Sequence, residues 1–434
     1  MFAVLPKDIP LGLPAPVWLL TGIILLTFAA HILFVALMLG GTLASLFAEV
    51  LGLKNPDWDR IAEEIGSTLT VHKSTAVVLG VGPLLTINVL YTVYFYTANV
   101  LTGYAWLMIV ILVSTAFLLG YLHKYTWQRL GNHKGLHISF VAGAALLFLL
   151  IPFIFLSNIN LMLYPEWWWD VRSFWNALVL PNVIPRYFHF VTAAIGLTGL
   201  FFAWYFGREK YFDSLNLQTI SRQEVVSRFY VLALASTGAQ LFFGPFLFLT
   251  LPTRAVAMRL LVLLPIVIVL AIIVLVWLWR EIHAFEPLRR FWRIVVTLTV
   301  VIGIMVYVRH NVRETAIAPH RTAMVAKTLD YMAKVREAQD FVVIPGGLGG
   351  KPASPGELLF QRTCAACHAI DRRLVGPPLA QVAPLYKGNP QGIVAWDEHP
   401  GRRRPDYPPM PPQNLPPDQL LQVAQYILEA TGNQ

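Results

Sequence analysis

Two cysteines and a histidine form the motif with the most specific chemistry in the sequence, Cys364-Ala-Ala-Cys367-His368. Cys364 and Cys367 are the only cysteines among the 434 residues. In such a C-x-x-C-H string the two thiols can bind the vinyl groups of a haem through thioether bonds, and the histidine can supply an axial nitrogen. We therefore predict one covalent c-type haem. A redox dithiol, a structural disulfide and half of a zinc site are the alternatives for cysteines at this spacing.

The sequence on both sides of this motif resembles that of a class I cytochrome c. Gly356-Glu-Leu-Leu-Phe360 resembles the N-terminal helix of the family, Gly376-Pro-Pro-Leu379 resembles the loop after the haem motif, and residues 417–431 resemble the C-terminal helix. Met410, in Tyr407-Pro-Pro-Met410, lies where the family places its sixth iron ligand. The resemblance implies axial ligation by His368 and Met410, which leaves no open iron position and suits electron exchange.

The rest of the chain has the composition of a membrane protein. Hydrophobic residues make up 56% of the sequence and charged residues only 13%. Apolar runs long enough to cross a bilayer occur at 17–48, 74–97, 104–122, 138–158, 189–206, 228–250, 259–279 and 294–308. We predict an all-α fold, with a transmembrane bundle of about eight helices and a small all-α cytochrome c domain.

The loop charges predict the orientation in the membrane. With the N-terminus outside, the inside loops hold about 14 Lys and Arg residues and the outside loops about five, in agreement with the positive-inside rule. An even number of spans then places both termini and the cytochrome c domain on the extracytoplasmic side of a bacterial or archaeal cytoplasmic membrane. The inside loops also account for the net charge of +9, so we expect no nucleic-acid partner. The first apolar run lacks the features of a cleavable signal peptide and is expected to be a permanent span.

Composition divides the chain into three parts. Residues 1–312 form the predicted haem b transmembrane domain, residues 313–355 an amphipathic helix (321–339) followed by a Gly/Pro-rich linker, and residues 356–434 the cytochrome c domain. The outside loop 159–188 carries Trp167, Trp168, Trp169 and Trp175, a pattern typical of an interfacial aromatic belt.

Histidines within apolar runs are candidate haem ligands, because ionisable groups in a membrane are costly. His31 lies deep in the first run, and His310 closes the last one. His189 and Met258 each open a span from the outside, so they are expected at similar depth as the axial pair of one haem b. His72 could share a haem with His31, although an interfacial side chain next to Lys73 is the alternative.

The other six histidines lie in or beside polar loops, and we expect them to be solvated or interfacial. They are His123, His133, His137, His283, His320 and His399.

The membrane part, over most of residues 15–315, resembles subunit I of the cytochrome bd quinol oxidases. The resemblance is carried by the ten residues from His31 to Gly40, by Trp127-Gln-Arg-Leu-Gly131, and by residues 173–192 around His189. It implies that His31 and His189 are haem ligands. Met258 falls near the methionine that pairs with the second of these histidines in that family.

Three departures fall on the features that make a bd enzyme a quinol oxidase. The long outer loop of quinol oxidation is replaced by Leu251-Pro-Thr-Arg254, so we expect quinone not to be a partner. The two glutamates of the third span correspond to Ala105 and Val113. A further glutamate ligand corresponds to His310, and a histidine ligand suits a low-spin relay haem.

These features favour a membrane electron-transfer cytochrome that is a subunit of a respiratory complex rather than a complete terminal oxidase. We expect this chain to have no catalytic residues of its own. Electrons would pass between intramembrane b haems and the c haem, which would connect to an outer redox partner such as a soluble cytochrome. Two b haems are the working number, with one or three as alternatives. The expected partners are other membrane and extracytoplasmic redox subunits and membrane lipid. A cytochrome c-dependent bd-like oxygen reductase and a haem-free membrane anchor for a cytochrome c are the competing hypotheses.

Overall fold

The computed structural model describes residues 13–286, 288–342 and 354–432, without the side chains of residues 70–74 and 337–342. The chain divides into two compact units, Met1–Ala326 and Lys327–Gln434. The described residues form helices and no strand, which confirms the predicted all-α fold.

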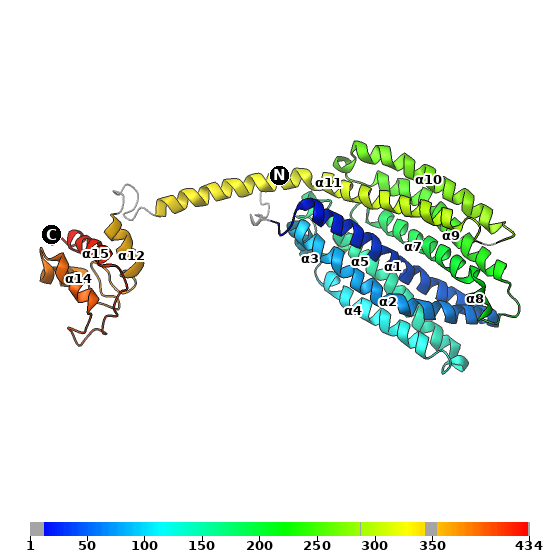
Figure 1. The fold of residues 1–434 in the computed structure, drawn as a ribbon, viewed down its shortest axis with the longest axis horizontal. Helices are drawn as coiled ribbons and strands as arrows, with labels where there is room; N and C mark the ends of the chain where they lie inside the picture. The colour runs from blue at the N-terminus through cyan, green and yellow to red at the C-terminus, as the bar shows by residue number, and fades with distance from the viewer. Residues whose placement is uncertain (1–12, 287, 343–353, 433–434) are drawn as a thin grey trace. The chain divides into compact units, whose positions relative to one another are not determined.

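The first unit is a bundle of long apolar helices lying side by side (Figure 1). Among the described residues, seven helices are long and apolar enough to cross a membrane, and a bent pair of helices raises the number to eight, as predicted. The helices of this part are α1 (Val17–Gly52), α2 (Pro56–Leu90), α3 (Thr92–Thr102), α4 (Tyr104–Tyr125), α5 (Lys134–Leu161), α6 (Phe174–Leu178), α7 (Val183–Gly207), α8 (Glu209–Asp213), α9 (Arg222–Leu249), α10 (Met258–Ile282) and α11 (Phe291–Val342).

The bent pair is formed by α2 and α3. Residues 75–90 of α2 and helix α3 meet at an angle of 110° at Tyr91, whose φ of −130° and ψ of 35° are not helical. The apolar run 74–97 therefore contains a break that its sequence does not signal. Asn158 on α5 donates hydrogen bonds to Asn99 (2.8 Å) and to Thr102 (3.2 Å), so α5 holds α3 in place.

Small residues allow α7 to pack closely against α1 on one side and α9 on the other. A Cβ atom at Gly40 of α1 would lie 2.6 Å from the backbone oxygen of Ala194. A Cβ atom at Gly199 of α7 would lie 2.7 Å from the backbone oxygen of Phe229 on α9. Such close backbone approach is a common way for membrane helices to associate, because apolar side chains gain little by leaving lipid.

Asp57 ties the start of α2 to the segment that precedes α9. Its carboxylate accepts hydrogen bonds from the backbone N–H groups of Gln218, Thr219 and Ile220 and from the Thr219 hydroxyl. Burial raises the pKa of Asp57, but these hydrogen bonds outweigh burial and lower it to about 2. An ionised Asp57 therefore fixes this end of the bundle at neutral pH.

Helix α11 differs from the sequence prediction in its length. It runs without interruption from Phe291 to Val342, with Pro319 inside it, so the predicted amphipathic segment 321–339 continues the last membrane helix. Its buried residues beyond Pro319 include His320, Met324 and Thr328. This long helix crosses the boundary between the two compact units.

The second unit contains a small helical domain built on the contact between its first and last helices. Its helices are α12 (Pro355–Thr363), α13 (Leu379–Val382), α14 (Pro390–Glu398) and α15 (Pro417–Ala430). Phe360 of α12 packs against Tyr426 of α15, with ring centroids 5.4 Å apart and the rings tilted by 48°. The two backbones approach so closely at Gly356 that a Cβ atom there would lie 2.1 Å from the backbone oxygen of Gln422.

Candidate functional site

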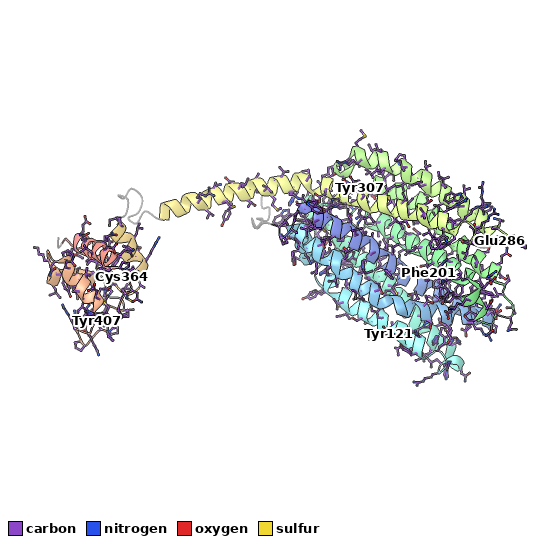
Figure 2. All side chains as sticks on the ribbon, viewed as in Figure 1. Tyr121, Phe201, Glu286, Tyr307, Cys364 and Tyr407 are labelled. Carbon is purple, nitrogen blue, oxygen red and sulfur yellow. The ribbon has the colours of Figure 1, made fainter. Side chains whose placement is uncertain are left out.

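Both cysteines of the motif in the second unit stand directly after α12. The helix starts at a capped N-terminus, where the Ser354 hydroxyl accepts from the backbone N–H of Glu357. At its end the N–H groups of Cys367 and His368 donate to the Cys364 carbonyl (3.1 and 2.9 Å), which forms a tight turn. Figure 2 labels Cys364 in this turn. The thiols of Cys364 and Cys367 are free and half-buried, so the disulfide alternative is not formed.

The ring of His368 is held in one orientation. Its Nδ1 atom lies 3.0 Å from the backbone oxygen of Pro377, and since a carbonyl only accepts, Nδ1 carries the hydrogen. The other nitrogen, Nε2, is then left with its lone pair, as a metal-ligating histidine requires. Gly376 packs against the ring, where a Cβ atom would lie 2.3 Å from Cε1. The residue types and this cradle fit an iron ligand.

Met410 is half-buried in a proline-rich loop that its neighbours fix in place. Its N–H group donates to the Gly401 carbonyl at 3.3 Å. Nearby, Tyr407 is buried, and the guanidinium of Arg373 stacks over its ring at 4.4 Å while donating to the backbone oxygen of Asp406. A thioether held in a fixed loop fits the role of a sixth ligand.

In the membrane unit, His189 lies half-buried near the start of α7, and one of its ring nitrogens is buried without a hydrogen-bond partner among the described residues. The amide of Gln240 on α9 donates to the backbone oxygen of His189 (3.1 Å), but Nδ1 of its ring has no hydrogen-bond partner among the described residues. A buried polar atom without a partner is costly, and one explanation is a metal or ligand at the site. His189 therefore fits a haem ligand.

Met258 and His189 occupy different environments. Met258 is the first residue of α10, and its side chain is 73% exposed. Their pairing at one haem thus remains a prediction.

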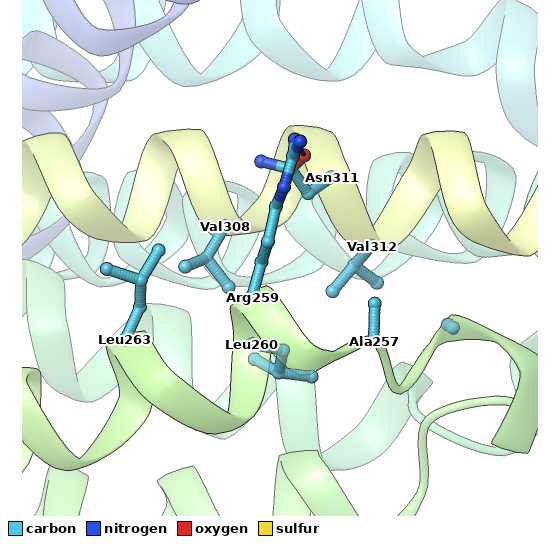
Figure 3. A pocket seen from close by; sticks show the side chains of 8 residues that line it. Ala257, Arg259, Leu260, Leu263, Val308, Asn311 and Val312 are labelled. Atoms are coloured by element: carbon cyan, nitrogen blue, oxygen red, sulfur yellow. Dashed lines mark hydrogen bonds between the residues drawn. The ribbon is translucent and has the colours of Figure 1, made fainter.

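Beside Met258 lies a small pocket between the start of α10 and α11 (Figure 3). Its lining includes Arg259, Val308 and Asn311. The Arg259 guanidinium donates to the side chains of Tyr307 and Asn311 at 3.4 and 3.3 Å.

His31, on α1, is oriented in the same way as His368. Its Nδ1 atom lies 2.9 Å from the backbone oxygen of Ala76 on α2, which leaves Nε2 available. Gly80 allows the ring to approach α2, because a Cβ atom there would lie 2.9 Å from Cε1. The side chain of His72, the suggested partner of His31, lies outside the described residues.

His310, on α11, belongs to a polar network at the break between α2 and α3. Its Nδ1 atom lies 3.4 Å from the hydroxyl of Tyr91, and this hydroxyl donates to the Glu314 carboxylate. Glu314 in turn forms an ion pair with Arg321 at 3.0 Å. The break in the helix thus coincides with a group of polar side chains around a candidate ligand.

Three arginines near these histidines have no acidic partner. Arg186 precedes His189 by one helical turn, and Arg309 and Arg313 flank His310. Their positive charges act on one another, and Arg313 is only 6% exposed. No ion pair among the described residues includes them. Neighbouring positive charges within a membrane domain need a counter-charge, which fits an anionic group such as the carboxylates of a haem.

Sequence reasoning was wrong for three histidines that it placed in solvated or interfacial positions. His123, His137 and His320 are 3%, 0% and 5% exposed. His320 packs against Tyr94 and Trp168, with its Nδ1 3.1 Å from the Tyr94 hydroxyl. His133, His283 and His399 are exposed as predicted.

Trp168 itself departs from the predicted aromatic belt. It is buried, and its Nε1–H donates to the Leu161 carbonyl, whereas Trp167, Trp169 and Trp175 are exposed.

Sequence reasoning also missed Glu49, which meets His123 and His137 in the bundle. The available signal was a single carboxylate inside an otherwise apolar helix, since such a group needs a partner.

Comparisons with known proteins find different relatives for the two units. The model of the family "Cytochrome c" matches residues 353–431. Cytochrome c-551 of Pseudomonas denitrificans is 34% identical over 79 residues, which are 17% of this chain and 96% of the relative. Cytochrome c-552 of Hydrogenobacter thermophilus is 34% identical over 85 residues, 19% of this chain and 87% of the relative. Through this segment the chain belongs to the cytochrome c family.

The membrane unit has its own structural relative. The bd oxidase structure from Geobacillus thermodenitrificans matches with a TM-score of 0.55 and 12% identity, covering 75% of this chain and 97% of that chain. The chain is thus a membrane cytochrome that combines a bd oxidase fold with a cytochrome c domain, and it acts in electron transfer.

One carboxyl group in the cytochrome c domain is buried without a hydrogen-bond partner. Asp397, near the end of α14, is 7% exposed, and its Oδ2 has no partner among the described residues. Burial, with the charge of Glu398 adding to it, raises the pKa of Asp397 to about 6. The domain therefore contains an acid that ionises close to neutral pH.

Proposed function

We propose that the chain carries electrons between haem b in its membrane domain and haem c in its C-terminal domain, which exchanges them with an extracytoplasmic redox partner. When bound, each haem supplies one-electron redox chemistry through its iron. In this proposal Cys364 and Cys367 attach haem c, and His368 and Met410 are its axial ligands. The membrane domain holds two b haems, one with His189 and Met258 and the other with His31 and His310. His72 is a further candidate ligand.

The observation that carries the haem b part of the proposal is the unpaired ring nitrogen of His189 beside Arg186. An imidazole with a free nitrogen and an uncompensated cation one turn away provide the two contacts that a haem needs, one to iron and one to a carboxylate. The same two elements recur at the other position, where Arg309 and Arg313 flank His310.

The chain's own residues also suit a relay. His31 and His368 each donate their Nδ1 hydrogen to a backbone carbonyl, which presents Nε2 as a ligand and fixes the ring. Rigid ligands keep the geometry of a site similar in both oxidation states, as fast electron exchange requires. The connection between α9 and α10, residues 250–257, is short, so we propose a protein electron carrier and not a quinol as the partner.

We further propose that both termini and the cytochrome c domain lie on the extracytoplasmic side of a bacterial or archaeal cytoplasmic membrane. The basic loops support this orientation through the positive-inside rule. Other redox subunits of a respiratory complex are the proposed neighbours.

Haem analysis of the purified full chain tests this function. Pyridine haemochrome spectra should contain both haem b and haem c, and His189→Ala should remove a low-spin b signal while leaving haem c intact. His283→Ala, which changes an exposed histidine, is the matched control and should leave both signals unchanged. A spectrum with haem c alone would support the membrane-anchor hypothesis instead.

The bd oxidase fold keeps an oxygen reductase as a second candidate function. Carbon monoxide difference spectra of the reduced protein distinguish the two, because a relay without an open iron position gives no high-spin CO complex.

A further inference from the structure

Three side chains from three membrane helices meet in the interior of the bundle, apart from every proposed haem ligand. They are Glu49 of α1, His123 of α4 and His137 of α5, and each is at most 3% exposed. Glu49 lies 18 residues after His31 on the same helix, which corresponds to about 27 Å along α1. The group thus lies toward the opposite end of α1 from the candidate ligands, beside the basic loop 126–134.

The hydrogen bonds of His137 determine how many protons it carries. Its Nε2 atom lies 2.7 Å from the backbone oxygen of His123, and its Nδ1 atom bonds to Oε1 of Glu49. A carbonyl oxygen and an ionised carboxylate only accept hydrogen bonds. When Glu49 is ionised, both ring nitrogens therefore carry hydrogen, which makes His137 an imidazolium.

Glu49 is surrounded by donors in a way that favours its ionised form. His123 donates from Nε2 to Oε2 of Glu49 at 2.8 Å, and the ammonium of Lys134 lies 3.7 Å from Oε1. With His137, three nitrogens approach one carboxylate. Two N–H groups and a nearby cation stabilise a carboxylate better than a carboxylic acid. The proton shared by the pair is thus assigned to His137.

The charges of the surrounding groups balance when His137 is protonated. Lys134 forms an ion pair with Asp59 of α2 at 2.6 Å, and its ammonium also lies 4.3 Å from the centre of the Trp127 ring. Glu49 with His137 and Asp59 with Lys134 then form two neutral pairs. Glu63, on α2, is exposed, and its carboxylate interacts electrostatically with the charges of Lys134 and His137. A buried group in a membrane protein is stable only when its charges are paired in this way.

A divalent metal fits the same residues less well. The three ligand atoms lie within 4.8 Å of one another, as a metal would require. However, the direct N···O distance of 2.8 Å between His123 and Glu49 is that of a hydrogen bond, and a metal would replace this bond. A dication would also leave an excess positive charge close to Lys134.

We propose that Glu49 and His137 form a proton-binding site in the membrane domain, where the proton is held as a carboxylate–imidazolium pair. Release of the proton to solvent leaves an ionised Glu49 and a neutral His137 that keeps its hydrogen on Nε2. The partly exposed Lys134 and Asp59 lie between this pair and water, with side chains 23% and 26% exposed. This site goes beyond the proposed electron transfer and does not depend on any haem b assignment.

Nitrogen-15 NMR of ring-labelled histidines in the reduced full chain, reconstituted in lipid, tests the proposal. At about pH 8 exposed histidines are neutral, so one remaining imidazolium is expected in the wild type. Glu49→Gln should abolish it, because the amide can donate to a neutral Nδ1 of His137 in the same space. His133→Ala, which removes an exposed histidine four residues away, should keep it.

The wild-type spectrum decides the matter even if Glu49→Gln fails to fold. No imidazolium at about pH 8 in the wild type would overturn the proposal, and so would an imidazolium that persists in a folded Glu49→Gln. Elemental analysis supplies an independent measurement. One non-haem divalent ion per chain, removed by a chelator and absent in His137→Gln, would show that the site holds a metal instead of a proton.

Discussion

Substitution of Gly356 by alanine should strongly destabilise the cytochrome c domain. The added Cβ atom would lie 2.1 Å from the backbone oxygen and 2.8 Å from the backbone carbon of Gln422 on α15. Unstrained non-bonded atoms lie about 3.5 to 4.0 Å apart, so the two helices would have to separate by more than about 1 Å. Both partners in this clash are backbone, so no rotation of a side chain can relieve it.

The size of the effect follows from the cost of overpacking. Inserting a methyl group into a packed core costs about 1 to 3 kcal/mol, and a clash with backbone belongs at the upper end. We expect Gly356→Ala to lower the free energy of unfolding by about 3 kcal/mol, or about 100-fold in the folding equilibrium. For a small domain this corresponds to a decrease of about 1 to 3 M in the urea midpoint.

Urea titration of the full chain, followed by the circular dichroism of haem c, measures this change. Gly401→Ala is the matched control, because its Cβ atom would meet only the Trp396 ring at an ordinary 3.5 Å. The control should unfold at nearly the wild-type midpoint. If Gly356→Ala unfolds together with the control, the two helices do not pack at this distance and the reasoning is wrong.

Three further predictions concern other sites. Asp397→Asn should stabilise the cytochrome c domain at pH 7. Burial raises the folded-state pKa of Asp397 to about 6, so the free energy of unfolding of the wild type falls by up to about 3 kcal/mol as pH rises from about 4 to 6. Urea midpoints of the wild type should show this fall, and those of the variant should lack it. Asp57→Ala should lower the free energy of unfolding by about 2 to 3 kcal/mol, because the N–H groups of residues 218–220 lose a charged acceptor. Since the Asp57 pKa is lowered to about 2, the stability that this group gives the wild type persists above about pH 4 and is lost toward pH 2. Thermal unfolding in detergent, with Asp213→Ala as control, checks both statements. Gly376→Ala should reduce covalent haem c, measured by pyridine haemochrome, because the methyl group would displace the His368 ring, whereas Gly401→Ala should be fully loaded.

The features that sequence alone predicted are those encoded by neighbouring residues. The C-x-x-C-H motif occupies five consecutive positions, and each membrane span is a continuous apolar run, so both can be recognised locally. The membrane bundle, its number of spans and the cytochrome c domain are accordingly confirmed.

The features that sequence reasoning missed depend on contacts between distant residues. Glu49 meets its two histidines across 74 and 88 residues, so loop composition alone suggested that His123 and His137 were solvated. Helix α11 was expected to end before residue 321, yet it continues through Pro319. A proline removes one backbone donor but does not always end a helix, and packing of the neighbouring turns decides the outcome.

The break at Tyr91 has a consequence for the way this protein enters the membrane. Residues 75–102 leave the ribosome as one apolar segment, but in the mature chain this segment bends by 110° near its middle. A lipid bilayer does not accommodate such a bend unless protein neighbours supply polar contacts. The neighbours of α3 are Asn158 on α5 and residues of α11, both of which are synthesised later. This segment therefore reaches its final path only after later helices have inserted, and a nascent chain truncated before α5 should leave it misplaced.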